Sequence, residues 1–204
     1  MGTYQNWILP RLIDLVMRNR ALTAYRQRLV PKAEGRVLEI GVGSGLNLPF
    51  YSDQVSHVIG LDPSFELLEM AWDAAKRSAM PVSLLNGSAG AIPLPDKSID
   101  TVVTTWTLCS IPEVERALAE VRRVLRPGGA FLFVEHGLAP EPGVQRWQHC
   151  LTPAWRRVGG GCHLNRAPDR LLASAGLHVT DLETGYMSGP RPMTFMYEGR
   201  ARAR

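Results

Sequence analysis

Val37-Leu38-Glu39-Ile40-Gly41-Val42-Gly43-Ser44-Gly45 joins a short apolar run to a loop with glycine at every second position. An apolar run of this length predicts a buried strand, and the glycines after it let the chain turn sharply toward a helix. Because these positions lack side chains, a ligand can approach the backbone amides closely. The stretch therefore predicts a strand followed by a ligand-binding loop.

From residue 31 onward, short apolar runs alternate with stretches of helical periodicity. This alternation is typical of a parallel sheet with crossover helices. Arg126-Pro127-Gly128-Gly129 predicts a turn that ends one helix before the next strand. Strands are expected at 36–40, 57–62, 82–86, 100–106, 130–135, 177–184 and 193–197, and helices at 64–78, 112–125, 144–158 and 167–175. We expect an α/β fold with a Rossmann-like, seven-stranded, mostly parallel sheet, helices on both faces and an N-terminal helical lid.

Residues 1–30 have the periodicity of an amphipathic helix, in which Pro10 lies in the first turns and can bend the axis. Such a helix commonly caps a domain or covers its pocket, and a basic helix with tryptophan can also lie on a membrane surface. We therefore expect a helical cap, with peripheral membrane contact through residues 1–20 as the alternative. Its apolar face comprises Tyr4, Ile8, Leu12, Leu15 and Val16, with Trp7 at the edge.

The composition is that of an ordinary globular chain. With 204 residues, 45% of them hydrophobic and 21% charged, the chain can bury one substantial core. The formal net charge of +4, much of it in the tail 200–204, is too weak and dispersed to indicate a nucleic-acid partner. Arg11, Asp14 and Arg18 interrupt the N-terminal apolar stretch, so no run approaches the roughly 18 to 20 residues that span a bilayer. We expect neither nucleic-acid binding nor a membrane span.

Three widely spaced cysteines, Cys109, Cys150 and Cys162, are present without the pattern of a signal peptide. An odd number of cysteines in this context favours a reducing, cytoplasmic location, with membrane association as the alternative. Although His149 and His163 flank two of them, the spacing gives no paired CxxC or HxxxH arrangement. We therefore expect no metal site.

Two features distinguish the glycine loop from a dinucleotide-binding loop. Leu46, Asn47 and Leu48 follow it, so the third glycine of the dinucleotide fingerprint is missing. Glu39 lies immediately inside the loop, where a carboxylate can organise amides or water around a cationic amino-acid ligand. Both features favour S-adenosylmethionine over NAD as the cofactor.

Further cofactor contacts are expected where the following strands end. Asp62 follows the loop by about 20 residues, where a carboxylate can accept hydrogen bonds from both ribose hydroxyls. N-capping of the helix that begins near Ser64 is the alternative role, and the two roles are compatible. The stretch from Ser88 onward is expected beside the adenine, with a plain loop as its alternative. The expected cofactor set is Glu39, Gly41, Gly43, Gly45, Asp62, Pro63, Ser88, Ala89, Thr105 and Leu108.

Taken together, four segments resemble the class I methyltransferases of the ubiquinone-biosynthesis type. They are residues 37–45, 60–63, 93–100 and 124–130. The resemblance covers roughly residues 34–136 and implies S-adenosylmethionine as the methyl donor and S-adenosylhomocysteine as the product. The family often carries an acidic residue near position 88 for the adenine amine, whereas Ser88, Ala89 and Gly90 offer a hydroxyl and backbone groups here.

A narrower resemblance extends over the second half of the chain. Residues 107–110, 133–136, 151–155, 161–166 and 191–192 look like the animal alkyl-thiol methyltransferases that associate with microsomal membranes and lipid droplets. This implies a methyltransferase domain over 31–204, an acceptor-side insertion at about 140–166, and S-methylation of a small apolar thiol. N-, O- or C-methylation of a phospholipid or quinone-like acceptor is the alternative. A non-catalytic cofactor-binding protein and a nucleic-acid methyltransferase rank lower. No oligomeric state follows from these residues.

The expected catalytic residues follow the fourth and fifth strands. His136 is the candidate base for a thiol acceptor, with helix capping or core hydrogen bonding as alternatives. Cys109 is expected to face the methyl donor, although a buried cysteine is usually a small hydrophobe. Val144, Leu151 and Val158 extend an apolar face expected to act as both lid and core. The expected acceptor set is Tyr4, Trp7, Trp147, Trp155, His163, Asn165, Arg166 and Arg191, in which Asn165–Arg166 could equally cap a helix and Arg191 could be a surface residue.

Overall fold

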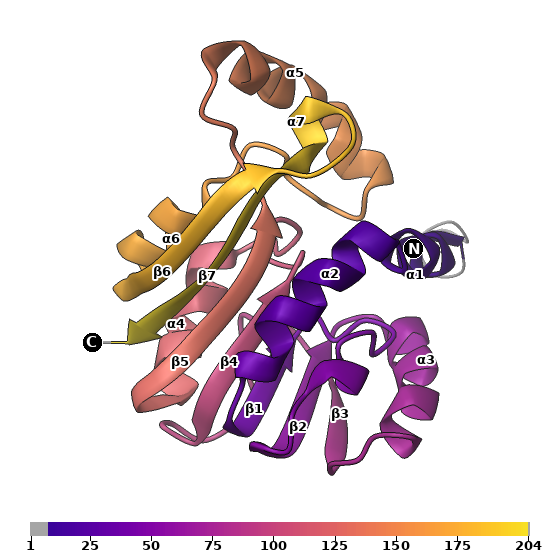
Figure 1. Ribbon diagram of the computed structural model, residues 1–204, viewed down its shortest axis with the longest axis vertical. Coiled ribbons are helices and arrows are strands. Elements are labelled where there is room, and N and C mark those ends of the chain that lie inside the picture. The colour runs from indigo at the N-terminus through magenta and orange to yellow at the C-terminus, as the bar shows by residue number, and fades with distance from the viewer. Residues whose placement is uncertain (1–7, 204) are drawn as a thin grey trace.

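A seven-stranded sheet forms the centre of the computed structural model, which describes residues 8–203 (Figure 1). The strand order is β3-β2-β1-β4-β5-β7-β6. The pairs among the first five strands are parallel, and β7 is antiparallel to both neighbours. The strands are β1 (Gly35–Ile40), β2 (Val55–Asp62), β3 (Val82–Asn86), β4 (Ile99–Thr105), β5 (Leu125–His136), β6 (Leu177–Tyr186) and β7 (Phe195–Ala203). The predicted Rossmann-like, mostly parallel sheet is confirmed.

Two strands, β5 and β7, differ most in length from the sequence expectation. The last strand, expected at 193–197, runs to Ala203, because its ladder with β5 continues as far as Arg202 opposite Ala130. The residues before it form the short helix α7 (Arg191–Thr194). The turn expected at 126–129 lies inside β5, which pairs through Leu125 and shows a register shift before Ala130. Short apolar runs thus identified these strands but not their ends.

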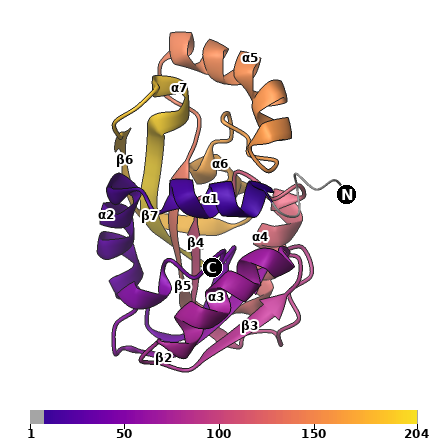
Figure 2. The same ribbon diagram turned by 90° about the vertical axis from the view of Figure 1, so that its right-hand side faces the viewer.

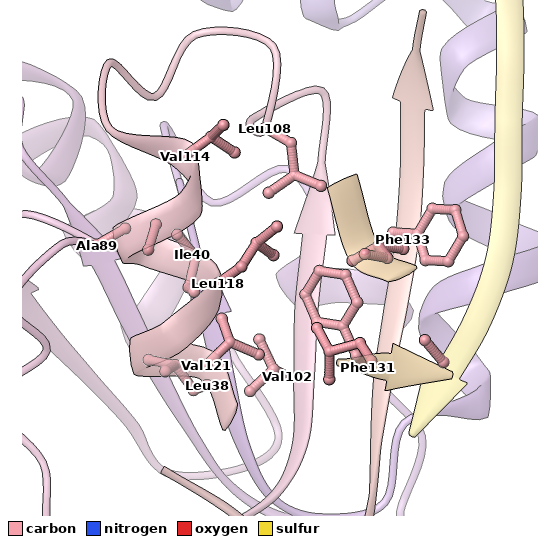
Figure 3. Close-up of a cluster of buried hydrophobic side chains, with 14 of the residues drawn as sticks. Leu38, Ile40, Ala89, Val102, Leu108, Val114, Leu118, Val121, Phe131 and Phe133 are labelled. Atoms are coloured by element: carbon pink, nitrogen blue, oxygen red, sulfur yellow. The ribbon is translucent and has the colours of Figure 1, made fainter. Parts of the chain in front are cut away.

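Helices cover both faces of the sheet. Leu29 of α2 (Arg20–Leu29) and Ala74 of α3 (Phe65–Lys76) pack in a cluster on one face. On the other face, α4 (Val114–Val124) buries Val114, Leu118 and Val121 against Leu38, Val102 and Phe131 of the strands (Figure 3), together with α6 (Pro168–Ser174). The helix α5 (Pro142–Val158) lies beyond the end of the sheet, next to α7 (Figure 1).

The expected single N-terminal helix is two helices, α1 (Leu9–Met17) and α2, which meet at an angle (Figure 2). The break lies at Asn19 rather than at Pro10. Asn19 caps α2 by accepting a 2.8 Å hydrogen bond from the Ala21 amide, whereas Pro10 sits in the first turn of α1, where its missing N–H costs nothing. Two 3₁₀ turns, η2 (Val30–Lys32) and η3 (Leu48–Phe50), complete the early connections. Over residues 8–203, no helix has the length and apolarity to cross a bilayer.

Candidate active site

A cavity of about 350 Å³ lies at the carboxyl ends of β1, β2 and β4, between the glycine loop and α1. This volume is within the range of ligand pockets, roughly 300 to 1,000 Å³. Eight of the ten expected cofactor residues line it, namely Glu39, Gly41, Gly43, Asp62, Pro63, Ser88, Ala89 and Thr105. Gly45 and Leu108 do not line it. The opening of a parallel sheet at the ends of its central strands is where such folds bind ligands.

The glycine loop bends because Gly41, Gly43 and Gly45 all have positive φ, at 73°, 55° and 80°. A Cβ on Gly41 would overlap the Thr107 side chain, so that position allows close packing. A Cβ on Gly43 would meet no atom closer than 4.0 Å, because this glycine faces the cavity. Gly45 instead packs against α3, with a hypothetical Cβ 3.1 Å from Ala74. Gly43 is therefore where a ligand can reach the backbone.

Glu39 is 1% exposed and holds both carboxylate oxygens in hydrogen bonds at the cavity wall. The Tyr51 hydroxyl donates to Oε2 at 2.7 Å, and the Asn47 amide donates to Oε1 at 2.8 Å and to Thr105 Oγ1 at 3.0 Å. Burial raises the Glu39 pKa to about 7, against the lowering effect of these donors and of Arg26. The carboxyl group is thus positioned for a cationic ligand that would favour its ionised form.

Arg26 of α2 is a buried cation on the same wall, and it was not among the expected site residues. It is 3% exposed, lies 4.9 Å from the Trp106 ring centroid, and donates to the Met17 carbonyl at 2.9 Å. Burial lowers its pKa to about 10, and its Nε has no hydrogen-bond partner among the described residues. Since a buried donor is ordinarily paired, this guanidinium has capacity left for an anionic ligand group.

Asp62 is 6% exposed and lines the cavity at the end of β2. Its carboxylate accepts 2.9 Å hydrogen bonds from the Gly43 and Ser64 amides. The cap of α3 is Ser64 itself, whose hydroxyl accepts from the Leu67 amide at 3.3 Å. Burial raises the Asp62 pKa, and the two amides lower it. Asp62 therefore ties the end of β2 to the glycine loop and remains at the cavity surface.

The helix α1 covers the cavity with one face and presents the other to solvent (Figure 2). The face identified from the sequence points outward: Ile8, Leu12, Leu15 and Val16 are 48%, 45%, 68% and 64% exposed. The lining face is Leu9, Pro10, Ile13, Asp14 and Met17. Periodicity cannot tell which of two apolar stripes on one helix meets the domain. Tyr4 and Trp7 lie outside the described residues.

The end of the cavity away from Glu39 is mostly apolar. Glu135 Oε1 fixes the loop that forms it, by accepting 3.1 Å hydrogen bonds from the Thr107 and Leu108 amides. Burial raises the Glu135 pKa to about 8. This end is lined by Leu9, Ile13, Thr107, Ser110, Ile111, Pro112 and Gly160. It contains two hydroxyl groups, and the described lining residues include no imidazole, amine or thiol. The carboxylates of the lining, Asp14, Glu39 and Asp62, each accept hydrogen bonds from other groups of the protein.

The expected catalytic pair, Cys109 and His136, lies behind this wall instead of on it. His136 Nε2 is 3.1 Å from Cys162 Sγ, and the Trp155 indole donates to the same sulfur at 3.2 Å. Cys109 is 4% exposed, and its contact with Cys162 lowers the Cys109 pKa, helped by the nearby His136. The ligand atoms of Cys109, His136 and Cys162 all lie within 4.8 Å of one another. The wide sequence spacing gave no reason to expect this grouping.

The remaining expected acceptor residues take structural positions outside the cavity. His163 bonds to the Cys109 carbonyl at 3.0 Å, Asn165 to His149 at 2.9 Å, and Arg166 to the Ile111 carbonyl at 2.8 Å. Arg191 is exposed and forms a 2.5 Å ion pair with Glu141. None of His163, Asn165, Arg166, Arg191, Trp147 and Trp155 is among the lining residues. These residues were assigned to the acceptor site by resemblance, and in the structure they do not line the cavity.

Only part of the expected apolar face of α5 packs inward: Val144 is partly buried against the main core cluster, whereas two other residues of that face are exposed. Trp147 is 62% exposed and Val158 is 54% exposed. The helix buries polar residues instead: Gln148 donates to the Gly137 and Pro192 carbonyls at 2.9 and 3.1 Å and accepts from the Ala139 amide at 2.9 Å. A single glutamine that satisfies three backbone groups decides which side of this helix faces inward.

Comparison with known proteins identifies the chain. A methyltransferase domain family matches residues 38–133. A phosphatidylethanolamine N-methyltransferase of Cereibacter sphaeroides is 35% identical, over 72% of each protein. The chain belongs to the S-adenosylmethionine-dependent methyltransferases. Another relative, thiol S-methyltransferase TMT1A of Homo sapiens, is 36% identical over 75% of the chain, which spans 64% of that protein's length. A methyltransferase structure from Thermotoga maritima shares the fold, with a TM-score of 0.69, 24% identity and 98% coverage of both chains.

The methyltransferase assignment fits the cavity. The open space at Gly43 accommodates a ligand against the backbone, and Arg26 and Glu39 both line the same cavity. S-Adenosylmethionine carries an ammonium group, a carboxylate group and a ribose. The cavity wall offers Glu39 for the ammonium, Arg26 for the carboxylate and Asp62 for the ribose. Of the residues at this end, Arg26, Asn47 and Tyr51 were not expected, because their approach to Glu39 depends on tertiary packing.

Proposed function

We propose that this methyltransferase transfers the methyl group of S-adenosylmethionine to the sulfur of a small, apolar thiol. The observation that carries the proposal is the composition of the cavity's far end. There, apolar side chains and two hydroxyls line the space. The described lining residues include no histidine, cysteine or lysine, and their three carboxylates, Asp14, Glu39 and Asp62, are already hydrogen-bonded to other groups of the protein. The acceptor must therefore present a reactive lone pair without a neighbouring general base.

The cofactor end supplies binding and orientation. In this proposal Glu39 holds the ammonium, Arg26 the carboxylate and Asp62 the ribose hydroxyls, while Ser88 and Ala89 border the adenine. When bound, S-adenosylmethionine supplies an electrophilic methyl group on a sulfonium. The protein contributes alignment of the acceptor with that methyl group and exclusion of water, the two main requirements of an in-line displacement.

A thiol suits a wall without a base better than an alcohol or a carbon acid does. A free thiol has a pKa near 8.5, so a few per cent is thiolate at neutral pH, and the thiolate is intrinsically a strong nucleophile. Its proton leaves to solvent before transfer, and the new S–CH3 bond forms as the sulfonium S–CH3 bond breaks. Apolar side chains from Leu9, Ile13 and Ile111 would bind the alkyl part of such an acceptor.

The names of relatives support the same reaction class, since human and rodent proteins 34–37% identical to this chain are thiol S-methyltransferases. A panel of alkyl thiols, alkyl alcohols and alkylamines of matched chain length, incubated with labelled S-adenosylmethionine, tests the proposal. We expect methyl thioethers from the thiols only. Methylation confined to the amines or alcohols would refute S-methylation while leaving the methyltransferase assignment intact.

A second candidate is N-methylation of a phospholipid headgroup at a membrane surface. Two observations favour it: the outward apolar face of α1, and the 35% identical relative named as a phosphatidylethanolamine N-methyltransferase. An exposed apolar stripe on an amphipathic helix is typical of interfacial binding. Vesicles containing phosphatidylethanolamine would then bind the protein and accept label. Vesicles that neither bind nor become labelled exclude this candidate.

A further inference from the structure

We propose that Cys109, His136 and Cys162 form a binding site for one zinc ion, behind the acceptor end of the cavity. Two sulfur atoms and one imidazole nitrogen lie within 4.8 Å of one another, from three segments far apart in sequence. Cys109 follows β4, His136 ends β5, and Cys162 lies in the loop after α5. Two thiolates and a histidine are a ligand set that zinc prefers.

The distances require only small shifts. Zinc–sulfur bonds of about 2.3 Å and zinc–nitrogen bonds of about 2.0 Å place tetrahedral ligand atoms roughly 3.5 to 4 Å apart. His136 Nε2 and Cys162 Sγ are already 3.1 Å apart, so they separate slightly to admit an ion. Three protein ligands leave the fourth position for water or another ligand, as in zinc sites that are not fully closed.

The surroundings suit a charged centre. The Trp155 indole donates to Cys162 Sγ at 3.2 Å, which is how groups around a metal site orient its thiolates. Two thiolates and one zinc ion are together neutral, so the ion removes the cost of burying ionised sulfur. Two buried atoms here, His136 Nδ1 and Glu135 Oε2, have no hydrogen-bond partner among the described residues. Zinc held by Nε2 would pair neither atom, so each of them still needs another partner, such as an ordered water.

The site would join the walls of the cavity. Cys109 is adjacent to Ser110, and Cys162 lies two residues after Gly160; Ser110 and Gly160 both line the acceptor end. The His163 amide already donates to the Cys109 carbonyl at 2.8 Å, so the two loops lie in contact. An ion shared by them would fix the shape of the acceptor end.

Zinc content of the whole chain, purified with a thiol reductant from zinc-supplemented cells and measured by plasma mass spectrometry, tests this inference. We expect about one zinc per chain in the wild type and in Cys150→Ser, whose exposed thiol lies outside the cluster, and at least about a tenfold loss in Cys109→Ser and Cys162→Ser. Trp155→Phe, which removes the indole donor alone, should weaken zinc binding by about tenfold or more without abolishing it. The measurement needs no acceptor, so its result is independent of the thiol proposal.

Two measurements on the wild type keep the inference testable if a variant fails to fold. Cobalt substitution should give thiolate-to-metal charge-transfer absorption, and zinc X-ray absorption should show two sulfur ligands near about 2.3 Å. Overturning results are a metal-free wild type after zinc addition, loss of zinc in Cys150→Ser alone, or zinc retained by both cluster variants. A Cys109–Cys162 disulfide found by mass spectrometry under the same reducing conditions also overturns it.

Discussion

The Ser44 hydroxyl donates a 2.5 Å hydrogen bond to Asp14 Oδ1, and both side chains are buried. This bond joins α1 to the glycine loop, 30 residues later in the chain. Arg18 pairs with the other Asp14 oxygen at 2.9 Å, and these contacts lower the Asp14 pKa, although burial opposes them. A hydrogen bond to a carboxylate is stronger than one between neutral groups, so this contact holds the lid closed.

Asp14→Ala should raise the KM for S-adenosylmethionine by about tenfold, because a lost buried hydrogen bond to a charged group costs about 1.5 to 3 kcal/mol. Steady-state kinetics with a fixed acceptor measures this. Arg18→Ala is the matched control: it removes a largely exposed ion pair but leaves the Asp14–Ser44 bond, so its effect should stay below about threefold. Equal effects of the two variants would show that the Ser44 contact does not hold the lid.

Glu39 should make cofactor binding pH-dependent. Its pKa of about 7 means that it is protonated in acid, whereas a cationic ligand favours the carboxylate. The affinity for S-adenosylmethionine should therefore rise with pH between about 5.5 and 7.5, and binding should release a proton. Calorimetry in buffers of different ionisation enthalpy measures both effects. In Glu39→Gln the affinity should be lower and nearly flat over this range; a parallel pH dependence in that variant would assign the titration elsewhere.

The contribution of Glu39 to the free energy of unfolding of the ligand-free protein should fall as the pH rises, whereas its contribution to cofactor binding should increase. Burial raises its pKa from 4.5 in the unfolded chain to about 7, so the folded state favours the protonated form. The stabilisation relative to Glu39→Gln is complete below about pH 4.5 and is lost as the pH rises through about 7. Urea unfolding of both proteins at several pH values measures the difference. A difference that grows with pH would contradict the burial argument.

Arg26→Gln should weaken binding of S-adenosylmethionine by about tenfold and leave binding of its decarboxylated analogue almost unchanged, if this guanidinium holds the carboxylate. Isothermal titration of both proteins with both ligands gives four dissociation constants. The difference between the two ratios measures the interaction free energy between the Arg26 side chain and the ligand carboxylate. Arg28→Gln is the control on the same helix, since Arg28 is half-exposed and pairs with Glu198 at 2.6 Å, away from the cavity. An equal loss of affinity for both ligands in Arg26→Gln would indicate that the substitution disturbs the fold instead.

The two faces of α1 should have separable roles. Ile13→Ser, on the cavity face, should reduce kcat/KM more for long alkyl thiols than for short ones, because each buried methylene contributes about 0.8 kcal/mol. Leu12→Ser, on the outward face, should leave these values unchanged and weaken binding to lipid vesicles. A uniform loss of activity across chain lengths in Ile13→Ser would indicate a disturbed lid.

Local patterns in the sequence were enough for the sheet and for most of the cofactor wall. Seven strands and the turn at Gly41 and Gly43 follow from short-range periodicity and glycine spacing, and Asp62 follows from its place at a strand end. Asn47 and Tyr51 were not found, because a polar residue in a loop has no pattern that identifies its partner. Their contacts with Glu39 arise only when η3 packs against β1.

The acceptor side was harder for a related reason. Helical periodicity describes a stripe but not what it packs against, so the exposed Trp147 was assigned to a lid, while Gln148 makes the buried contacts. Similarly, His136 ends β5 and Cys109 follows the adjacent strand β4, which predicts that both lie near the cofactor. Whether they reach the cavity depends on the path of the loop held by Glu135, which the sequence does not specify.

The bond between Asp14 and Ser44 connects two parts of the protein and does not involve the ligand. This contact holds α1 over the cavity without any bound ligand, so we expect donor entry and product departure to be faster when it is broken. In such an enzyme, exchange of S-adenosylhomocysteine for fresh donor can limit turnover, as lid opening does in many enzymes. A variant in which the Asp14–Ser44 hydrogen bond is weakened should then bind S-adenosylmethionine less tightly but have a higher kcat at saturating donor concentration.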